Sequence, residues 1–164
     1  MIKTKFTEEV IFPSGKKVII EQVISLAPST KIAKNFTLKE FANNLTTDDI
    51  KMIWNKDVAE HVAMVQDFRD VRGIPLDVSS GYRTEEFNAR IGGDPKSLHL
   101  IGCASDHPFS NLTDSLYIEI RSIWKTICFI HGKIGGINRY EKYVHLSSRE
   151  DLFGHTEFVE RDLR

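Results

Sequence analysis

Two segments of the chain carry side chains that can hold a metal ion. The first runs from Ser97 to Asp106 and reads Ser-x-His-x-x-Gly-x-Ala-x-Asp, where the histidine is His99. The second begins with Gly135-Gly136-Ile137 and ends in Tyr-Val-His at His145. A hydrolytic zinc site uses three protein ligands from His, Asp or Glu and leaves a fourth position for water. Two imidazoles and one carboxylate supply that set, which predicts that His99, Asp106 and His145 bind Zn²⁺.

The spacing of these residues restricts how they can meet. His99 and Asp106 are seven residues apart, too far for neighbours on one helical turn, so a loop must pass the metal and then enter a strand. Gly102 and Ala104 keep the intervening backbone small, so that it can lie close behind the site. His145 must come from a separate strand. A single histidine on an apolar strand is more often an ordinary core residue, so the prediction depends on the combination.

A third segment makes the combination more specific. It is Ser80-Gly81-Tyr82-Arg83-Thr84, followed by Asn88 and by Gly92-Gly93. Together the three segments resemble the zinc D-Ala-D-Ala carboxypeptidases and related peptidoglycan endopeptidases, whose fold is shared with lysostaphin-type enzymes and the hedgehog signalling domain. The resemblance covers about residues 35–149 and implies the same three zinc ligands.

The resemblance also implies roles for residues around the metal. Arg83 would hold a substrate carboxylate or polarise the scissile carbonyl, since its paired donors stay charged and match carboxylate oxygens; a structural ion pair is the alternative. Ser97 would bind substrate or orient its loop. Tyr82 would line the substrate cleft or belong to the core.

The residue that accepts a proton from water is harder to assign. A hydrolase of this type needs a general base, and related enzymes carry an acid three residues before the last histidine or two residues after it. Lys142 and Ser147 stand at those positions. We predict Glu141 as the base, although an unbroken strand would place it roughly 13 Å from the histidine, so a turn or bulge must shorten that distance. Glu150 and Asp151 are alternatives, as is a loss of activity.

The other histidines and the two cysteines are weaker candidates. His107 follows Asp106 directly and would point to the opposite face of a strand, behind the metal. His61 is expected to be exposed on a helix. Cys103 and Cys128 are too few for a disulfide framework, and both are expected to be buried packing residues.

These residues must be positioned by an α+β fold, a small antiparallel sheet carrying the zinc site with helices packed on one side. One domain is expected over residues 1–164, with an N-terminal hairpin extension at 1–30, a core at 35–149 and a tail at 150–164 that forms loop with some helix. Strands are predicted within residues 3–25 and at 76–79, 135–137 and 143–146. Helices are predicted over 56–72 and after caps at Thr37, at Thr84 and at Thr113 or Asp114. A short helical turn is expected around Ile50 and Trp54, after a polar link at 45–49.

The bulk properties limit the possible partners. The chain has 164 residues, 41% of them hydrophobic, and a formal net charge of −1, which gives no reason to expect nucleic acid as a partner. No apolar run is long enough for membrane insertion. The N-terminal sequence MIKTKFTEEV does not read as a signal peptide, so we expect synthesis in the cytoplasm, and we expect a monomer.

The leading functional hypothesis is a zinc metallopeptidase that hydrolyses amide bonds in peptidoglycan stem peptides, as a D,D-carboxypeptidase or an L,D-endopeptidase. Without a signal peptide, it would reach the cell wall as a phage-type endolysin or as part of a virion. The alternative is a non-catalytic, zinc-containing protein that binds the cell wall, or a structural virion protein with a degenerate site.

Overall fold

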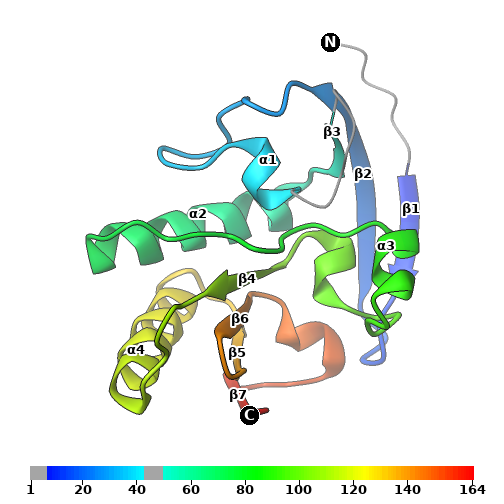
Figure 1. Ribbon diagram of the computed structural model, residues 1–164. Coiled ribbons are helices and arrows are strands. Elements are labelled where there is room, and N and C mark those ends of the chain that lie inside the picture. The colour runs from blue at the N-terminus through cyan, green and yellow to red at the C-terminus, as the bar shows by residue number, and fades with distance from the viewer. Residues whose placement is uncertain (1–6, 43–49) are drawn as a thin grey trace.

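The computed structural model describes residues 7–42 and 50–164, and it confirms the α+β class (Figure 1). One sheet has the order β1-β2-β3 and the other has the order β4-β6-β5-β7. The strands are β1 (Thr7–Ile11), β2 (Lys17–Leu26), β3 (Ile50–Ile53), β4 (Ala104–Pro108), β5 (Gly136–Arg139), β6 (Tyr143–Ser147) and β7 (Val159–Asp162). The helices are α1 (Leu38–Phe41), α2 (Lys56–Arg72), α3 (Glu85–Arg90) and α4 (Asp114–Ile130), with 3₁₀ turns η1 (Leu98–Ile101) and η2 (Glu150–Phe153).

The helix ends follow signals that are local in the sequence. Asn55 begins α2, and its side-chain oxygen accepts a hydrogen bond of 3.0 Å from the backbone N–H three residues on. Gly73 ends α2 in the left-handed conformation with φ 67°, which glycine adopts without strain. Thr84 and Thr113 cap α3 and α4 in the way that Asn55 caps α2. Thr37 precedes α1 within the predicted capping box. The caps predicted at Thr37 and Thr84 are confirmed, and of the alternatives Thr113 and Asp114 the structure has Thr113.

The strand predictions are partly wrong. The hairpin is confirmed, since β1 and β2 pair antiparallel, but the helical turn expected around Ile50 is instead β3, which pairs with β2. Pairing with a neighbouring strand here overrides local preference. The strand predicted at 76–79 does not form, because the backbone pairing of this extended segment with β4 is limited to a single bridge between Ser80 and Asp106. The link predicted at 45–49 lies outside the described residues.

The tail differs from the expected mixture of loop and helix. It contains η2 and then β7, which pairs in parallel with β5 and makes the second sheet mixed (Figure 1). The β7 sequence Val-Glu-Arg-Asp lacks the apolar alternation of a half-buried strand, and a short polar strand of this kind is typical of a sheet edge. The sheet that was predicted within residues 35–149 therefore extends into the tail.

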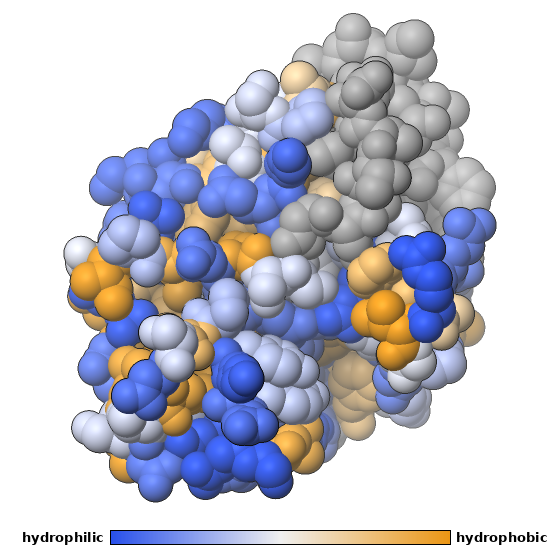
Figure 2. Space-filling model, viewed as in Figure 1, coloured by the Kyte–Doolittle hydropathy of each residue, from blue (hydrophilic) through white to orange (hydrophobic). Residues whose placement is uncertain are grey.

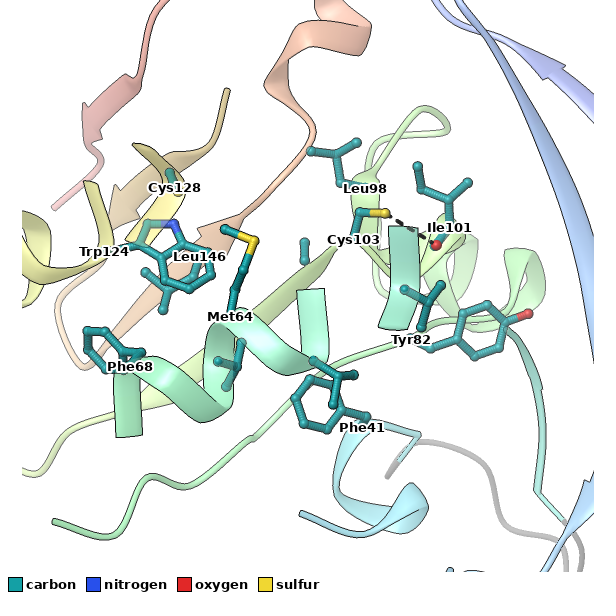
Figure 3. Packing of buried hydrophobic residues seen from close by; sticks show 14 of the residues in the cluster. Phe41, Met64, Phe68, Tyr82, Leu98, Ile101, Cys103, Trp124, Cys128 and Leu146 are labelled. Carbon is teal, nitrogen blue, oxygen red and sulfur yellow. Dashed lines mark hydrogen bonds between the residues drawn. The ribbon is translucent and has the colours of Figure 1, made fainter. Parts of the chain in front are cut away.

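The core joins α2 and α4 to the sheet that contains β4, β5 and β6. Trp124 of α4 is fully buried and lies near Phe68 and Leu146 (Figure 3). Its indole N–H is 3.1 Å from the carbonyl oxygen of Gly136 and 3.2 Å from that of Ser147. A single side chain thus holds α4 against both β5 and β6. On the face shown in Figure 2 hydrophilic residues predominate, and apolar ones form small separate groups.

The two free cysteines are buried, as predicted, and Cys103 lies in this core (Figure 3). Burial raises the pKa of both thiols, Cys128 to about 12, which keeps them protonated. Within the ranges 7–42 and 50–164, no helix combines the length and the apolar character needed to cross a membrane.

His61 is fully buried, so the expectation of an exposed side chain is wrong. Its two ring nitrogens lie 3.1 Å from the hydroxyl of Ser148 and 3.0 Å from that of Ser105. The same Ser105 hydroxyl is 2.8 Å from His107, which points away from Asp106 as predicted. Serine hydroxyls can donate or accept hydrogen bonds, so Ser105 and Ser148 satisfy the ring nitrogens of a buried histidine. The helical pattern of the sequence does not reveal these partners, because they come from other elements.

This burial makes stability depend on pH. Burial lowers the pKa of His61 well below its ordinary value of 6.5, and His107, His99 and His145 lower it further. Below about pH 6.5 the unfolded chain therefore binds a proton that the folded protein does not, so the free energy of unfolding decreases as pH falls. We expect His61 to contribute up to about 1.4 kcal/mol per pH unit. Urea unfolding of metal-free protein between about pH 7.5 and 5 measures this slope, and a His61→Gln variant with an unchanged slope would contradict the prediction.

Candidate metal centre

The three predicted zinc ligands converge from separate elements. His99 in η1, Asp106 in β4 and His145 in β6 each offer a ligand atom, and these atoms all lie within 4.8 Å of one another. His99 Nε2 is 3.1 Å from His145 Nδ1 and 3.2 Å from Asp106 Oδ1. His145 Nδ1 is 2.9 Å from the same carboxylate oxygen. Three lone-pair donors thus face one point, as a metal ion requires.

The antiparallel pairing of β4 with β6 explains part of this convergence. Asp106 and His145 are direct partners across the two strands, so their side chains leave the same face of the sheet. Gly102 ends η1 with φ 70° and leads into β4. A Cβ atom on Gly102 would come within 2.9 Å of Val58, which confirms that a small residue is needed behind the site.

The backbone fixes the orientation of His99. Its Nδ1 lies 2.6 Å from the carbonyl oxygen of Gly81. A carbonyl can only accept, so Nδ1 carries the proton and Nε2 presents a lone pair to the cluster. Metal-binding histidines commonly donate their second N–H in this way. Gly81 itself lies against the backbone of Phe41, where a Cβ atom would meet the Phe41 carbonyl. The donor set therefore fits a zinc ion.

The ligands also have suitable charge. Burial lowers the pKa of His99, so the imidazole is neutral, the form that binds a metal. Burial by itself would raise the pKa of Asp106, but His99 and His145 lower it to well below its usual range. Asp106 is consequently an ionised carboxylate.

Arg83 holds the outer oxygen of Asp106. Its Nη2 donates to Asp106 Oδ2 at 2.6 Å and its Nε donates to the hydroxyl of Ser80 at 2.8 Å. The backbone N–H of Arg83 also donates to the carbonyl oxygen of His99. The structure therefore shows the ion pair that was the alternative to substrate binding. Because Arg83 also lines the adjacent cavity, its role toward substrate stays a prediction.

Replacing Arg83 by alanine is expected to weaken zinc binding about ten- to hundredfold, because Asp106 loses the guanidinium that orients it. At saturating zinc we expect kcat/KM to fall about a hundredfold. Chelator competition measures the first effect, and peptide cleavage measures the second. Arg90→Ala removes an exposed arginine of α3 and should change neither. An Arg83→Ala variant with normal zinc affinity and normal kinetics would exclude Arg83 from the site.

A cavity of about 580 Å³ opens beside the ligands. Its lining is largely polar and includes cationic, amide and aromatic side chains that sequence reasoning missed, namely Lys96, Asn138, Tyr140, Tyr143, Phe153 and Arg161. The rings of Tyr140 and Tyr143 are stacked with centroids 4.3 Å apart. No motif marks these residues, since they come from the loop before η1, from β5, β6 and their turn, from η2 and from the tail.

Ser97 and Tyr82 take different places relative to this cavity. Ser97 lines it, and its hydroxyl accepts a hydrogen bond of 3.3 Å from the backbone N–H of His99, which orients the turn. Tyr82 belongs to the core at 7% exposure and is shown among buried residues in Figure 3. Burial raises the pKa of Tyr82 to about 12. Of its two proposed roles, packing is the one that its position supports.

Glu141, predicted as the base, lies exposed in the turn between β5 and β6. The two strands remain regularly paired up to Arg139 and Val144. A turn at Glu141 and Lys142 is present, since the backbone N–H of Tyr140 donates to the carbonyl oxygen of Tyr143, but it leaves Glu141 exposed and outside the cavity lining. Among the described residues that line the cavity, the acids are Asp94, Asp106 and Glu150. Of these three acids, Glu150 follows β6 in the chain, and it is the one that the sequence predicts as an alternative general base.

Comparison with known proteins agrees with this geometry. No curated protein matches the chain. The sequence pattern of the Peptidase M15 family matches residues 34–147, more than half of the chain, from just before α1 to the end of β6. The matched stretch includes all three converging ligands. The chain therefore belongs to the peptidase M15 family of zinc-dependent metallopeptidases.

Proposed function

We propose that this metallopeptidase hydrolyses amide bonds in peptidoglycan stem peptides, as a D,D-carboxypeptidase or an L,D-endopeptidase. The observation that carries the proposal is the cluster of His99, Asp106 and His145 in the wall of an open, polar cavity. A cavity of about 580 Å³ has room for a short peptide. Under this proposal the protein acts at the cell wall, in the manner of a phage-type endolysin.

Each group in the site has a part in this chemistry. A zinc ion held by His99, Asp106 and His145 would polarise the scissile carbonyl and lower the pKa of a water molecule. Arg83 keeps the Asp106 carboxylate turned toward the two imidazoles. Lys96 and Arg161 offer positive charge along the cavity wall. The carboxylates of a stem peptide suit such a lining.

Incubation of the zinc-loaded protein with purified peptidoglycan tests the proposal. Mass spectrometry of the released material should show loss of a terminal alanine for a D,D-carboxypeptidase, or release of stem peptides for an L,D-endopeptidase. A His145→Ala protein is the control and should release neither. Zinc-loaded protein that binds the wall but releases no peptide would favour the non-catalytic wall-binding alternative.

A further inference from the structure

Glu150 is a buried acid that faces the cavity from outside the family match. It is only 4% exposed, although it is the first residue of η2. Its side chain lines the same cavity as His145. Its carboxylate Oε1 accepts a hydrogen bond of 2.7 Å from the hydroxyl of Ser147, and its backbone N–H donates to the carbonyl oxygen of Ile134. These contacts hold the acid against the end of β6 and against the segment that precedes β5.

The strand places this contact on the metal side of the sheet. Side chains two apart on a strand share a face, so Ser147 points the same way as His145. Asp106, the direct partner of His145, lies on this face as well. The Ser147 side chain is short, and its hydroxyl holds the Glu150 carboxylate on this face by the hydrogen bond described above. The β6 residues on this face are Tyr143, His145 and Ser147, none of which is an acid. Glu150 therefore supplies the carboxylate that β6 itself lacks there.

Gly136 makes room for the pair. It is the partner of Ser147 across β5 and β6. A Cβ atom at Gly136 would stand 3.0 Å from Glu150 Cγ, 3.1 Å from Glu150 Oε1 and 3.1 Å from the Ser147 hydroxyl oxygen. Contacts this short would require the Glu150 side chain to shift by a few tenths of an ångström.

The second carboxylate oxygen remains able to accept a proton. Glu150 Oε2 lies 3.6 Å from Arg161 Nη2 and 3.9 Å from His155 Nε2. Both distances lie within the range of ion pairs but exceed those of hydrogen bonds, so neither side chain donates a hydrogen bond to that oxygen. The Arg161 guanidinium donates instead to Asn138 Oδ1 at 3.2 Å. A carboxylate oxygen that accepts no hydrogen bond from these two side chains keeps its lone pairs for a proton donor such as water.

We propose that Glu150 is the general base of this enzyme, an inference that rests on the proposed peptide hydrolysis. Its carboxylate takes a proton from the attacking water while the water oxygen forms a bond to the carbonyl carbon. When the C–N bond breaks, the nitrogen keeps the electron pair and receives that proton from Glu150. The products are a carboxylic acid and an amine, and the Glu150 carboxylate is restored.

Glu150→Gln keeps the shape of the side chain but cannot accept the proton. We expect full zinc content and a kcat lower by about a hundredfold or more, with little change in KM. Glu141→Gln should retain wild-type turnover. If Glu141 were the base, as the sequence predicted, this variant would show the large loss of kcat instead. Glu157→Gln, which alters an exposed acid of the tail, is the control. Gly136→Ala should lower kcat with zinc retained, because it displaces the carboxylate.

A second readout does not depend on the substrate. In the cobalt-substituted protein, the visible absorption spectrum reports ionisation at the metal as a function of pH. Glu150→Gln should shift the midpoint of that titration, and Glu157→Gln should not. If wild-type protein cuts no peptidoglycan but the midpoint shifts, the proposed function fails and Glu150 keeps its place beside the attacking water. Unchanged turnover or an unchanged midpoint in Glu150→Gln, or protein that binds no metal, would overturn the inference.

Discussion

Replacing His145 by alanine is expected to remove most of the bound zinc and to lower peptide hydrolysis by at least about a thousandfold. His145 Nδ1 lies within 3.1 Å of both other ligand atoms, so its loss leaves only His99 and Asp106 to hold the metal. Several kcal/mol of transition-state stabilisation go with the metal, and each 1.36 kcal/mol corresponds to about tenfold in rate. Metal analysis of purified protein and mass spectrometry of peptide products measure the two effects.

His99→Ala should give the same result, because the side chain that Gly81 holds in place would be lost together with its ligand atom. His131→Ala is the matched control. His131 lies at the end of α4, paired with Asp67 and away from the cavity lining, so zinc content and activity should stay normal. If both ligand variants retained full zinc, the assignment of the metal centre would be wrong.

Replacing Trp124 by alanine is expected to lower the free energy of unfolding by about 3–5 kcal/mol. The side chain is fully buried between α2, α4 and the sheet, so its removal leaves a large cavity. The carbonyl groups of Gly136 and Ser147 would also lose the indole N–H that they share. Urea unfolding followed by circular dichroism measures the change.

Trp124→Phe separates the two contributions to this loss. It retains most of the apolar volume and removes the N–H, so a smaller change of about 1–3 kcal/mol is expected. Phe129→Ala is the control, since Phe129 is 84% exposed on the same helix and should change stability by about 0.5 kcal/mol or less. A Trp124→Ala variant as stable as Phe129→Ala would show that Trp124 does not hold α4 to the sheet.

The sequence by itself predicted the three side chains that the structure brings together as a candidate metal site, and it predicted where the main helices begin. Helix ends depend on contacts within one turn, so caps such as Thr84 and Thr113 can be recognised directly. The three ligands could be identified because few kinds of site combine two histidines and a carboxylate at this spacing. The hairpin of β5 and β6 was predictable because it joins segments that are neighbours in the chain.

Only the tertiary structure decided which groups surround those ligands. From the sequence, Arg83 could bind a substrate or form an ion pair with an acid. In the structure β4 lies close to the segment before α3, and Arg83 pairs with Asp106. Glu141 is closer to His145 in sequence than Glu150 is, yet the regular hairpin turns it to solvent. Glu150 reaches the cavity because η2 folds back on β6 and because Gly136 leaves space for its side chain. Such contacts between distant segments depend on packing and free volume, which residue order alone does not specify.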